Sequence, residues 1–273
     1  MFYGILNNKY IKSNLSIKEY NGDIMIDTHI HLNDKAYTNN LEEIIKEANS
    51  VGVNKMIVIG YDKNSSIKAV EIANQHDNIY AMVGLHPSDV DKEQDRELNW
   101  LKQLLNEKKV IGIGEIGLDL YWTKEFKDLQ IEFFEKQLQM SLDYNLPICI
   151  HSRDAIELTY QILSKNNYKG IIHCYSGSLE MAKRFIKLGY LLGIGGVVTF
   201  KNTNLKEVVK NIPLTSIVTE TDGPYLAPTP YRGKLNKPEY IKLIVDEIAL
   251  LKDISTKEVE KQIDENVYGL LKI

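Results

Sequence analysis

The chain alternates short, continuously apolar runs with longer amphipathic segments. Eight such runs occur, at residues 24–29, 55–59, 79–85, 110–114, 147–151, 170–174, 190–195 and 216–220. Hydrophobicity that is continuous rather than alternating is typical of parallel strands covered on both faces. Helical periodicity marks the other segments, at residues 40–52, 64–76, 94–108, 125–145, 153–166, 178–188, 203–210, 237–252 and 255–271. The pattern predicts an α/β protein with a parallel sheet.

Eight β-then-α units, each roughly 25 to 35 residues long, predict a closed (β/α)8 barrel of the TIM type that forms a single domain. A doubly wound open sheet is the alternative. Side chains able to bind metal stand at the C-terminal ends of the first, fourth, fifth, sixth and eighth runs. Only a closed sheet brings all five ends together, at the face where such barrels place their active sites.

Residues 1–24 lie outside this pattern. They are rich in Asn, Lys and Ser, and Met25 stands directly before the first Ile-Asp-Thr-His. Three interpretations stay open for this stretch: a flexible extension, an interaction arm, or a start codon assigned too early. The predicted barrel domain therefore covers residues 25–273.

Charge and composition narrow the class of protein. The 273 residues carry a formal net charge of −4, which argues against a broad basic surface for nucleic acid. No window approaches the ~18 apolar residues that span a bilayer, and residues 1–6 are too short for a signal-peptide core. Both cysteines, Cys149 and Cys174, lie in apolar runs. We expect reduced, buried thiols in a cytoplasmic protein without a membrane partner.

A His-x-His pair, His29 and His31, ends the first apolar run. On an extended strand these residues point to the same face, which suits a shared cation. A lone histidine would more often be structural, but the pair reverses that expectation. Asp27 lies one layer beneath them on the same face, as a structural or orienting acid rather than a ligand.

Glu115 follows the fourth run, in Gly112-Ile-Gly114-Glu-Ile-Gly117. A buried carboxylate needs a cation or a hydrogen-bond network, so Glu115 is a candidate ligand. The segment also matches Gly-x-Gly-x-x-Gly. We reject a dinucleotide site, because an acid inside the loop would repel a pyrophosphate and no helix opens at Gly117.

Further candidates end the later strands. His151 and His173 are candidate metal ligands, and Arg153 can meet an anionic substrate or form a salt bridge. Asp222 can bind a metal and can also take a proton from an attacking water, because a bound divalent cation lowers the pKa of that water towards ~7. Glu220 would orient one of its partners. His86 completes the ring, either as a ligand or, as we favour, in contact with substrate.

Seven motifs occur in one unbroken order from residue 25 to the C-terminus. They are Asp27-Thr-His-x-His, Gly84-Leu-His-Pro, Gly114-Glu-Ile-Gly-Leu-Asp119, Ile150-His-Ser-Arg-Asp-Ala155, His173-Cys-Tyr-Ser-Gly177, Glu220-Thr-Asp-x-Pro-Tyr225 and Arg232-Gly-Lys. Together they resemble the TatD-type metal-dependent deoxyribonucleases of the amidohydrolase superfamily. The resemblance implies a (β/α)8 barrel and a divalent-metal phosphodiesterase that cuts DNA.

The resemblance also implies a division of the candidate residues. Two divalent ions, Mg, Mn or Zn, would be bound, one by His29, His31 and Asp222 and the other by His151 and His173, with Glu115 bridging them. Asp222 and Glu115 would be the catalytic acids, and His86 and Arg153 would hold the phosphate. The chain departs from the family pattern at Leu120, at Leu235 and in residues 1–24, which bears on substrate choice rather than on the metal centre.

Several functions remain compatible with this centre. With this resemblance we expect an exonuclease on DNA ends, taken as 3′–5′, although the sequence itself does not read the polarity. The lack of a basic face predicts single-stranded ends rather than long duplex. A D-aminoacyl-tRNA deacylase is the alternative on the same site, and a non-catalytic metal-binding scaffold is a third. Amide-cleaving relatives often bridge their metals with a modified lysine where this chain has Glu115. The substrate is expected to be a nucleic acid, and the sequence leaves protein partners unknown.

Aromatic residues near the motif loops are candidates for stacking on unpaired bases. The alternative for any one of them is that it wedges a loop onto the barrel. The five residues are Tyr121, Trp122, Tyr175, Tyr225 and Tyr231.

Overall fold

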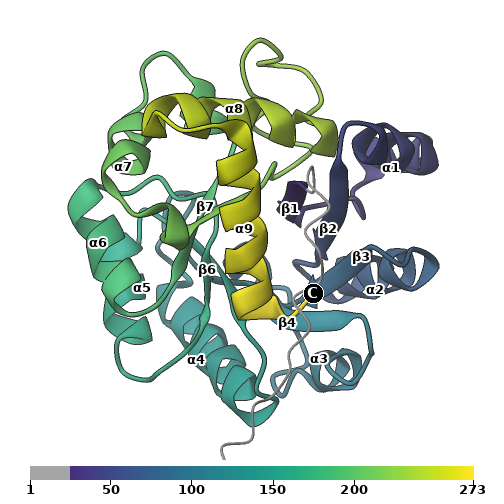
Figure 1. Ribbon diagram of the computed structural model, residues 1–273. Coiled ribbons are helices and arrows are strands. Elements are labelled where there is room, and N and C mark those ends of the chain that lie inside the picture. The colour runs from purple at the N-terminus through teal and green to yellow at the C-terminus, as the bar shows by residue number, and fades with distance from the viewer. Residues whose placement is uncertain (1–24) are drawn as a thin grey trace, which may run out of the picture.

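A computed structural model describes residues 25–273 of the chain, so the expectations for residues 1–24 lie outside the described residues. Eight parallel strands form one sheet in chain order, and helices surround it (Figure 1). The strands are β1 (Met25–Ile30), β2 (Val53–Ile59), β3 (Ile79–Val83), β4 (Val110–Asp119), β5 (Ile148–Arg153), β6 (Gly170–Ile172), β7 (Leu191–Ile194) and β8 (Ile217–Thr219). The predicted TIM-type (β/α)8 barrel is confirmed.

Hydrogen bonds between the first and last strands close the barrel. The Thr28 hydroxyl donates to the carbonyl of Thr219 at 3.0 Å, and the Thr219 hydroxyl donates to the carbonyl of Ile26 at 2.9 Å. Farther along, Ile30 and Gly223 form a parallel bridge. At this seam between β1 and β8, side-chain hydroxyls therefore make some of the hydrogen bonds that backbone groups make between the other strands of the sheet.

Nine α-helices cover the outside of the sheet and the seam within the described residues. They are α1 (Leu41–Ser50), α2 (Lys63–Gln75), α3 (Asn99–Leu104), α4 (Lys127–Asp143), α5 (Ile156–Leu163), α6 (Leu179–Lys187), α7 (Leu205–Asn211), α8 (Ile241–Lys252) and α9 (Thr256–Leu271). Short 3-10 turns lie at Lys35–Tyr37, Pro87–Asp89, Gly196–Thr199, Leu214–Ser216 and Pro238–Tyr240. None of these helices is both long and apolar enough to cross a bilayer.

The helix expected at residues 94–108 is much shorter than its periodicity suggested. Leu98 has a left-handed backbone, with φ of 48°, so a right-handed helix starts only after it. The Asp95 carboxylate accepts hydrogen bonds from the backbone N–H groups of Glu97 and Asn99. These local bonds form a turn that competes with the helix.

Capping explains where two other helices begin. Ser255 and Glu258 stand at capping-box spacing in the sequence, and they form that box at the start of α9. For α2 the sequence offers Asn64-Ser65-Ser66 as cap residues, but Asp62 is the N-cap and forms its box with Ser65. The helices predicted at residues 64–76 and 255–271 each begin within one residue of the observed starts, Lys63 and Thr256.

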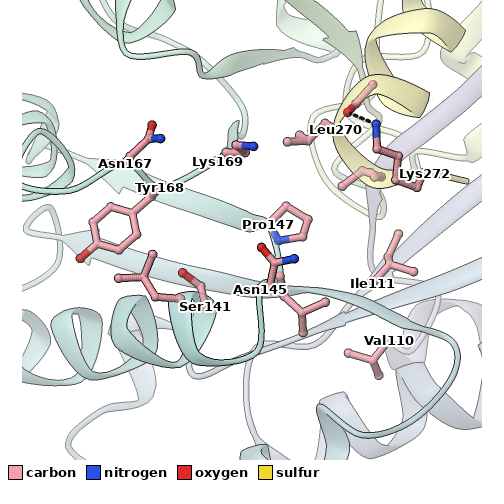
Figure 2. A pocket seen from close by; sticks show the side chains of 14 residues that line it. Val110, Ile111, Ser141, Asn145, Pro147, Asn167, Tyr168, Lys169, Leu270 and Lys272 are labelled. Atoms are coloured by element: carbon pink, nitrogen blue, oxygen red, sulfur yellow. Dashed lines mark hydrogen bonds between the residues drawn. The ribbon is translucent and has the colours of Figure 1, made fainter. Parts of the chain in front are cut away.

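The helix α9 crosses the end of the barrel at which the strands begin (Figure 1). The Asn266 side chain donates to the carbonyls of Leu214 and Ile217 at 2.9 and 2.7 Å, at the entry to β8. A cavity of about 460 Å³ opens at this end between the starts of β4 and β5 and the last turn of α9 (Figure 2). The opposite end, where the strands finish, carries the candidate ligands.

Candidate metal centre

The seam between β1 and β8 positions three of the predicted ligands. The backbone N–H of Asp222 donates to the carbonyl of His29 at 2.9 Å, and that of His31 donates to the carbonyl of Gly223 at 2.8 Å. The segment after β8 therefore runs on beside the end of β1. His29, His31 and Asp222 offer ligand atoms that all lie within 4.8 Å of one another.

Asp27 fixes this seam from within the barrel. Its carboxylate accepts hydrogen bonds from the backbone N–H and the hydroxyl of Thr221 and from the backbone N–H of His29. The side chain is fully buried, and a buried carboxylate requires partners of this kind. Asp27 therefore acts on the site by holding the residues next to Asp222 and within the His-x-His pair.

The ring nitrogens of His29 and His31 converge on one point. Their Nε2 atoms are 3.3 Å apart, and Asp222 Oδ1 lies 3.7 and 3.6 Å from them. His31 Nδ1 lies 3.0 Å from the carbonyl oxygen of Ile59. Because a carbonyl only accepts, Nδ1 carries the proton of the neutral ring and Nε2 presents its lone pair to the site.

Glu115 reaches the centre because β4 bulges. Between Ile113 and Ile116 the strand β4 advances three residues while its partner β5 advances two. Glu115 Oε2 lies 3.6 Å from His29 Nε2 and 3.7 Å from His31 Nε2. The expectation that Glu115 follows the end of its strand is wrong, because the pairing with β5 resumes after the bulge and continues to Asp119.

His151 and His173 face the other oxygen of the same carboxylate. Glu115 Oε1 lies 2.8 Å from His151 Nδ1 and 2.9 Å from His173 Nε2. The ring of His173 also stacks on that of His29, with 3.9 Å between centroids. Glu115 thus turns one oxygen to each pair of histidines. The fold brings all six side chains predicted as ligands into one cluster.

In His151 and in His173, the ring nitrogen that points away from Glu115 faces a further carboxylate, a different one in each case. Asp119 Oδ2 lies 3.1 Å from His151 Nε2, and Glu220 Oε1 lies 3.5 Å from His173 Nδ1. An acid in this place orients a metal-binding imidazole and raises its basicity. Glu220 was expected to orient a partner, whereas Asp119 was missed. The available signal was its place four residues after Glu115, on the same face of a longer strand.

The two central acids are held in their ionised form. Burial acts to raise the pKa of Glu115, but His173 and His86, in their protonated forms, outweigh it and hold that pKa well below its usual value. Burial also opposes ionisation of Asp222, but His31 and His173, in their protonated forms, outweigh it, so the pKa of Asp222 is lowered too. Carboxylates and imidazole lone pairs around one point form a donor set for divalent cations.

The two cysteines lie close to the cluster. Cys149 is buried, with its Sγ 3.3 Å from His29 Nδ1, and the backbone N–H of Cys174 donates to Glu220 Oε1. Burial raises the pKa of both thiols well above the usual value. Neutral thiols therefore lie beside the ligands. Cys149 is buried as expected, whereas Cys174 is only half-buried.

His86 lies against the cluster with a defined tautomer. The backbone N–H of Ser88 donates to His86 Nδ1 at 3.1 Å, so the neutral ring carries its proton on Nε2, which is 3.5 Å from Glu115 Oε1. By distance alone His86 groups with Glu115 and His151 as a further cation site. A protonated Nε2 is a donor, however, which suits an acceptor such as a phosphate oxygen better than a metal.

Arg153 ends β5 instead of starting a helix. Its guanidinium carbon lies 3.8 Å from the ring centroid of Tyr121. Within residues 25–273 no carboxylate comes within 4.0 Å of the guanidinium, so the salt-bridge alternative is not adopted. The exposed charge of Arg153 is available to an anion two residues beyond His151.

The five loop aromatics divide into two groups. Tyr175 is buried and donates from its hydroxyl to the carbonyl of Ser178, and the ring of Tyr231 stacks on Tyr240 with 4.3 Å between centroids. These two tyrosines pack loops onto the barrel. The other three side chains are exposed at this end of the barrel, at Tyr121, Trp122 and Tyr225.

Comparisons with known proteins agree with this architecture. The family model described as TatD related DNase matches residues 26–272. The metal-dependent hydrolase YabD of Bacillus subtilis is 41% identical over 254 residues, which cover 92% of this chain and 100% of YabD. The crystal structure of YjjV, a TatD homologue from Escherichia coli, is 30% identical with a TM-score of 0.87, covering 91% of this chain and 98% of that one.

Proposed function

The chain belongs to the TatD-related DNase family of metal-dependent hydrolases, and we propose that it cleaves phosphodiester bonds of DNA, as a 3′–5′ exonuclease on single-stranded ends. The proposal includes a binuclear centre of divalent cations. Its substrate is a nucleic acid end rather than a long duplex, because an acidic chain with a formal net charge of −4 offers little counterion release.

One observation carries the binuclear assignment: the two oxygens of Glu115 face different pairs of histidines. His29, His31 and Asp222 would hold one cation through Nε2, Nε2 and Oδ1. His151 and His173 would hold the second cation through Nδ1 and Nε2, with Glu115 shared. The atoms fit a cation because lone pairs and ionised oxygens, without an intervening donor, surround the point between them.

A cation pair at this place supplies positive charge for the phosphodiester and lowers the pKa of water. The chain's own residues do the remaining work. Asp222 takes the proton of the attacking water on its carboxylate, which its lowered pKa keeps ionised. His86 donates from Nε2 to a phosphate oxygen, and Arg153 holds the same group from the exposed side. Imidazole ligands favour zinc or manganese, and the two acids also permit magnesium.

The decisive experiment removes the metal and restores Mg²⁺, Mn²⁺ and Zn²⁺ one at a time. Each form is assayed on 3′-labelled single-stranded DNA, on 5′-labelled DNA and on a D-aminoacyl-tRNA. The proposal expects hydrolysis of DNA from the 3′ end with at least one metal. Hydrolysis of the tRNA ester alone would establish the deacylase instead, and activity on neither substrate with any metal would leave the scaffold.

Asp222→Asn is the matched variant for this assay. It keeps the shape of the side chain and the backbone hydrogen bond to His29, but the amide cannot accept the proton of water. Turnover should fall by about 10²- to 10⁴-fold while the thermal unfolding of the metal-free protein stays close to that of the wild type. Hydrolysis of DNA at the wild-type rate by this variant would remove Asp222 from its role as base.

A further inference from the structure

A second cavity, of about 320 Å³, lies beside the metal centre. The turn after β3, the end of β4 and the segment before α4 line it, with Pro87, Ser88, Asp91, Asp119, Trp122 and Phe126 among its residues. Pro87 directly follows His86, and Asp119 contacts His151 at 3.1 Å. The cavity therefore shares its inner wall with the cluster, although the proposed chemistry does not use it.

Trp122 forms the outer wall of this cavity, and Tyr121, which lies outside the lining, makes an aromatic pair with it. The Trp122 side chain is 72% exposed and the Tyr121 side chain 52%, and their rings meet edge to face with 4.8 Å between centroids. The guanidinium carbon of Arg153 lies 3.8 Å from the Tyr121 ring and 5.3 Å from the Trp122 ring. A ring this exposed leaves one face open to a planar partner.

Hydrogen bonds hold this wall in a fixed place relative to the cluster. The backbone N–H of Tyr121 donates to Asp119 Oδ1 at 3.0 Å, while the other carboxylate oxygen faces His151. The Gln130 side chain of α4 bonds both the N–H and the carbonyl of Asp119, at 3.0 and 2.9 Å. A ligand stacked on the aromatic pair would therefore be held at a set distance from the metal ligands.

The polar groups of the cavity select against a phosphate. Asp91 contributes an exposed carboxylate, whereas the oxygens of the buried Asp119 already face Tyr121 and His151. The lining Lys92 already has its ammonium 2.7 Å from Asp89. Acids repel an anion but accept hydrogen bonds from the N–H groups of an uncharged ring. A flat ring with N–H donors and an attached phosphate fits both the cavity and Arg153 at its edge.

We propose that this cavity binds the nucleobase next to the phosphodiester that is cut, stacked on Trp122, with the phosphate directed towards Arg153 and the metal cluster. This inference rests on the proposed function, because it assumes a nucleotide substrate. It makes Trp122 a residue that sets affinity for the base and leaves the metal centre unchanged.

The test compares the binding of dAMP with that of 2-deoxyribose 5-phosphate, which lacks the base. Both are titrated by calorimetry into protein loaded with whichever of Mg²⁺, Mn²⁺ or Zn²⁺ raises its Tm most. The wild type should bind dAMP at least about tenfold more tightly, the effect of one stacked base. Trp122→Leu should reduce this preference to less than about twofold, and Trp122→Phe should retain most of it.

Tyr268→Leu is the matched control, because it removes an exposed tyrosine, 53% accessible, from α9 at the other end of the barrel. It should keep the wild-type preference. Equal affinities in the wild type, or a preference that survives Trp122→Leu, would overturn the inference. A DNA hydrolysis assay on the same samples is a separate readout. A wild type that cleaves DNA but shows no base preference refutes only this inference, whereas a wild type that shows the base preference but does not cleave DNA refutes only the exonuclease.

Discussion

Gly193→Ala is expected to weaken the metal centre without changing a ligand. Gly193 lies in β7, and a Cβ there would come within 2.2 Å of Glu220 Oε2 and 2.6 Å of Glu220 Cδ. Carbon atoms in contact rest about 3.5–4.0 Å apart, so the carboxylate must move by roughly 1 Å. Glu220 is fully buried, which leaves it little room to do so.

The displacement has two measurable consequences. Glu220 Oε1 lies 3.5 Å from His173 Nδ1 and accepts from the backbone N–H of Cys174, so His173 loses its orienting partner. Losses of this kind cost about 10- to 100-fold in metal affinity, or about 1.4–2.7 kcal/mol. Overpacking itself lowers the free energy of unfolding by about 1–3 kcal/mol. At about 2–4 °C per kcal/mol for a chain of this size, Tm should fall by about 2–12 °C.

Gly195→Ala is the matched control, because its Cβ would meet the carbonyl oxygen of Glu220 at 3.6 Å, an ordinary contact. Metal-free proteins are titrated with the activating metal by calorimetry, and Tm is recorded with chelator present. Gly193→Ala should bind more weakly and Gly195→Ala as the wild type does. Glu220→Gln, which keeps an oxygen acceptor, should fall between them. A Gly193→Ala protein with a lower Tm but wild-type metal affinity would refute the role of Glu220 in holding His173.

Three further outcomes are expected. Arg153→Lys keeps the charge but loses the stacked plane over Tyr121, so KM for single-stranded DNA should rise several-fold in steady-state assays while kcat changes little; an unchanged KM would contradict phosphate binding by Arg153. Tyr37→Phe removes the buried hydroxyl that donates to the carbonyl of Asn236 at 2.6 Å, so calorimetric unfolding should show a loss of about 1–3 kcal/mol, and the exposed control Tyr268→Phe should show none. Chelation should lower Tm, because metal at 100 times Kd stabilises the folded state by about 2.7 kcal/mol; a Tm indifferent to chelator would contradict the metal centre.

The barrel was predictable because its main signals are local. Continuous apolar runs identify strands that helices cover on both faces, and their order along the chain is also their order in the sheet. Local competition is harder to read. The periodicity of residues 94–108 resembles one helix, yet the carboxylate of Asp95 and the left-handed backbone of Leu98 reduce it to Asn99–Leu104. Such turns depend on φ values that composition does not reveal.

The site was predictable to the extent that its ligands end strands. The convergence of His29, His31, His151, His173 and Asp222 follows from barrel closure, since the carboxyl ends of parallel strands meet at one face. The exposure of individual aromatics does not follow from spacing. Tyr175 and Trp122 both stand beside motifs in the sequence. The structure shows that Tyr175 is buried and donates a hydrogen bond from its hydroxyl, whereas the ring of Trp122 is exposed.

The bulge in β4 links the metal centre to the neighbouring cavity. After the extra residue, Glu115, Gly117 and Asp119 share a face, so one strand delivers the central carboxylate and the acid that contacts His151 and Tyr121. Gly117 permits this close pairing, because its φ is +143° and a Cβ would lie 2.0 Å from the carbonyl oxygen of His151. Side chains alternate along a strand, so a slip of one residue in the pairing of β4 would turn Asp119 away from His151. The same slip would also move Trp122 and Tyr121 relative to the cavity. We therefore expect the proposed metal binding and the proposed recognition of the base to depend together on the register of one strand.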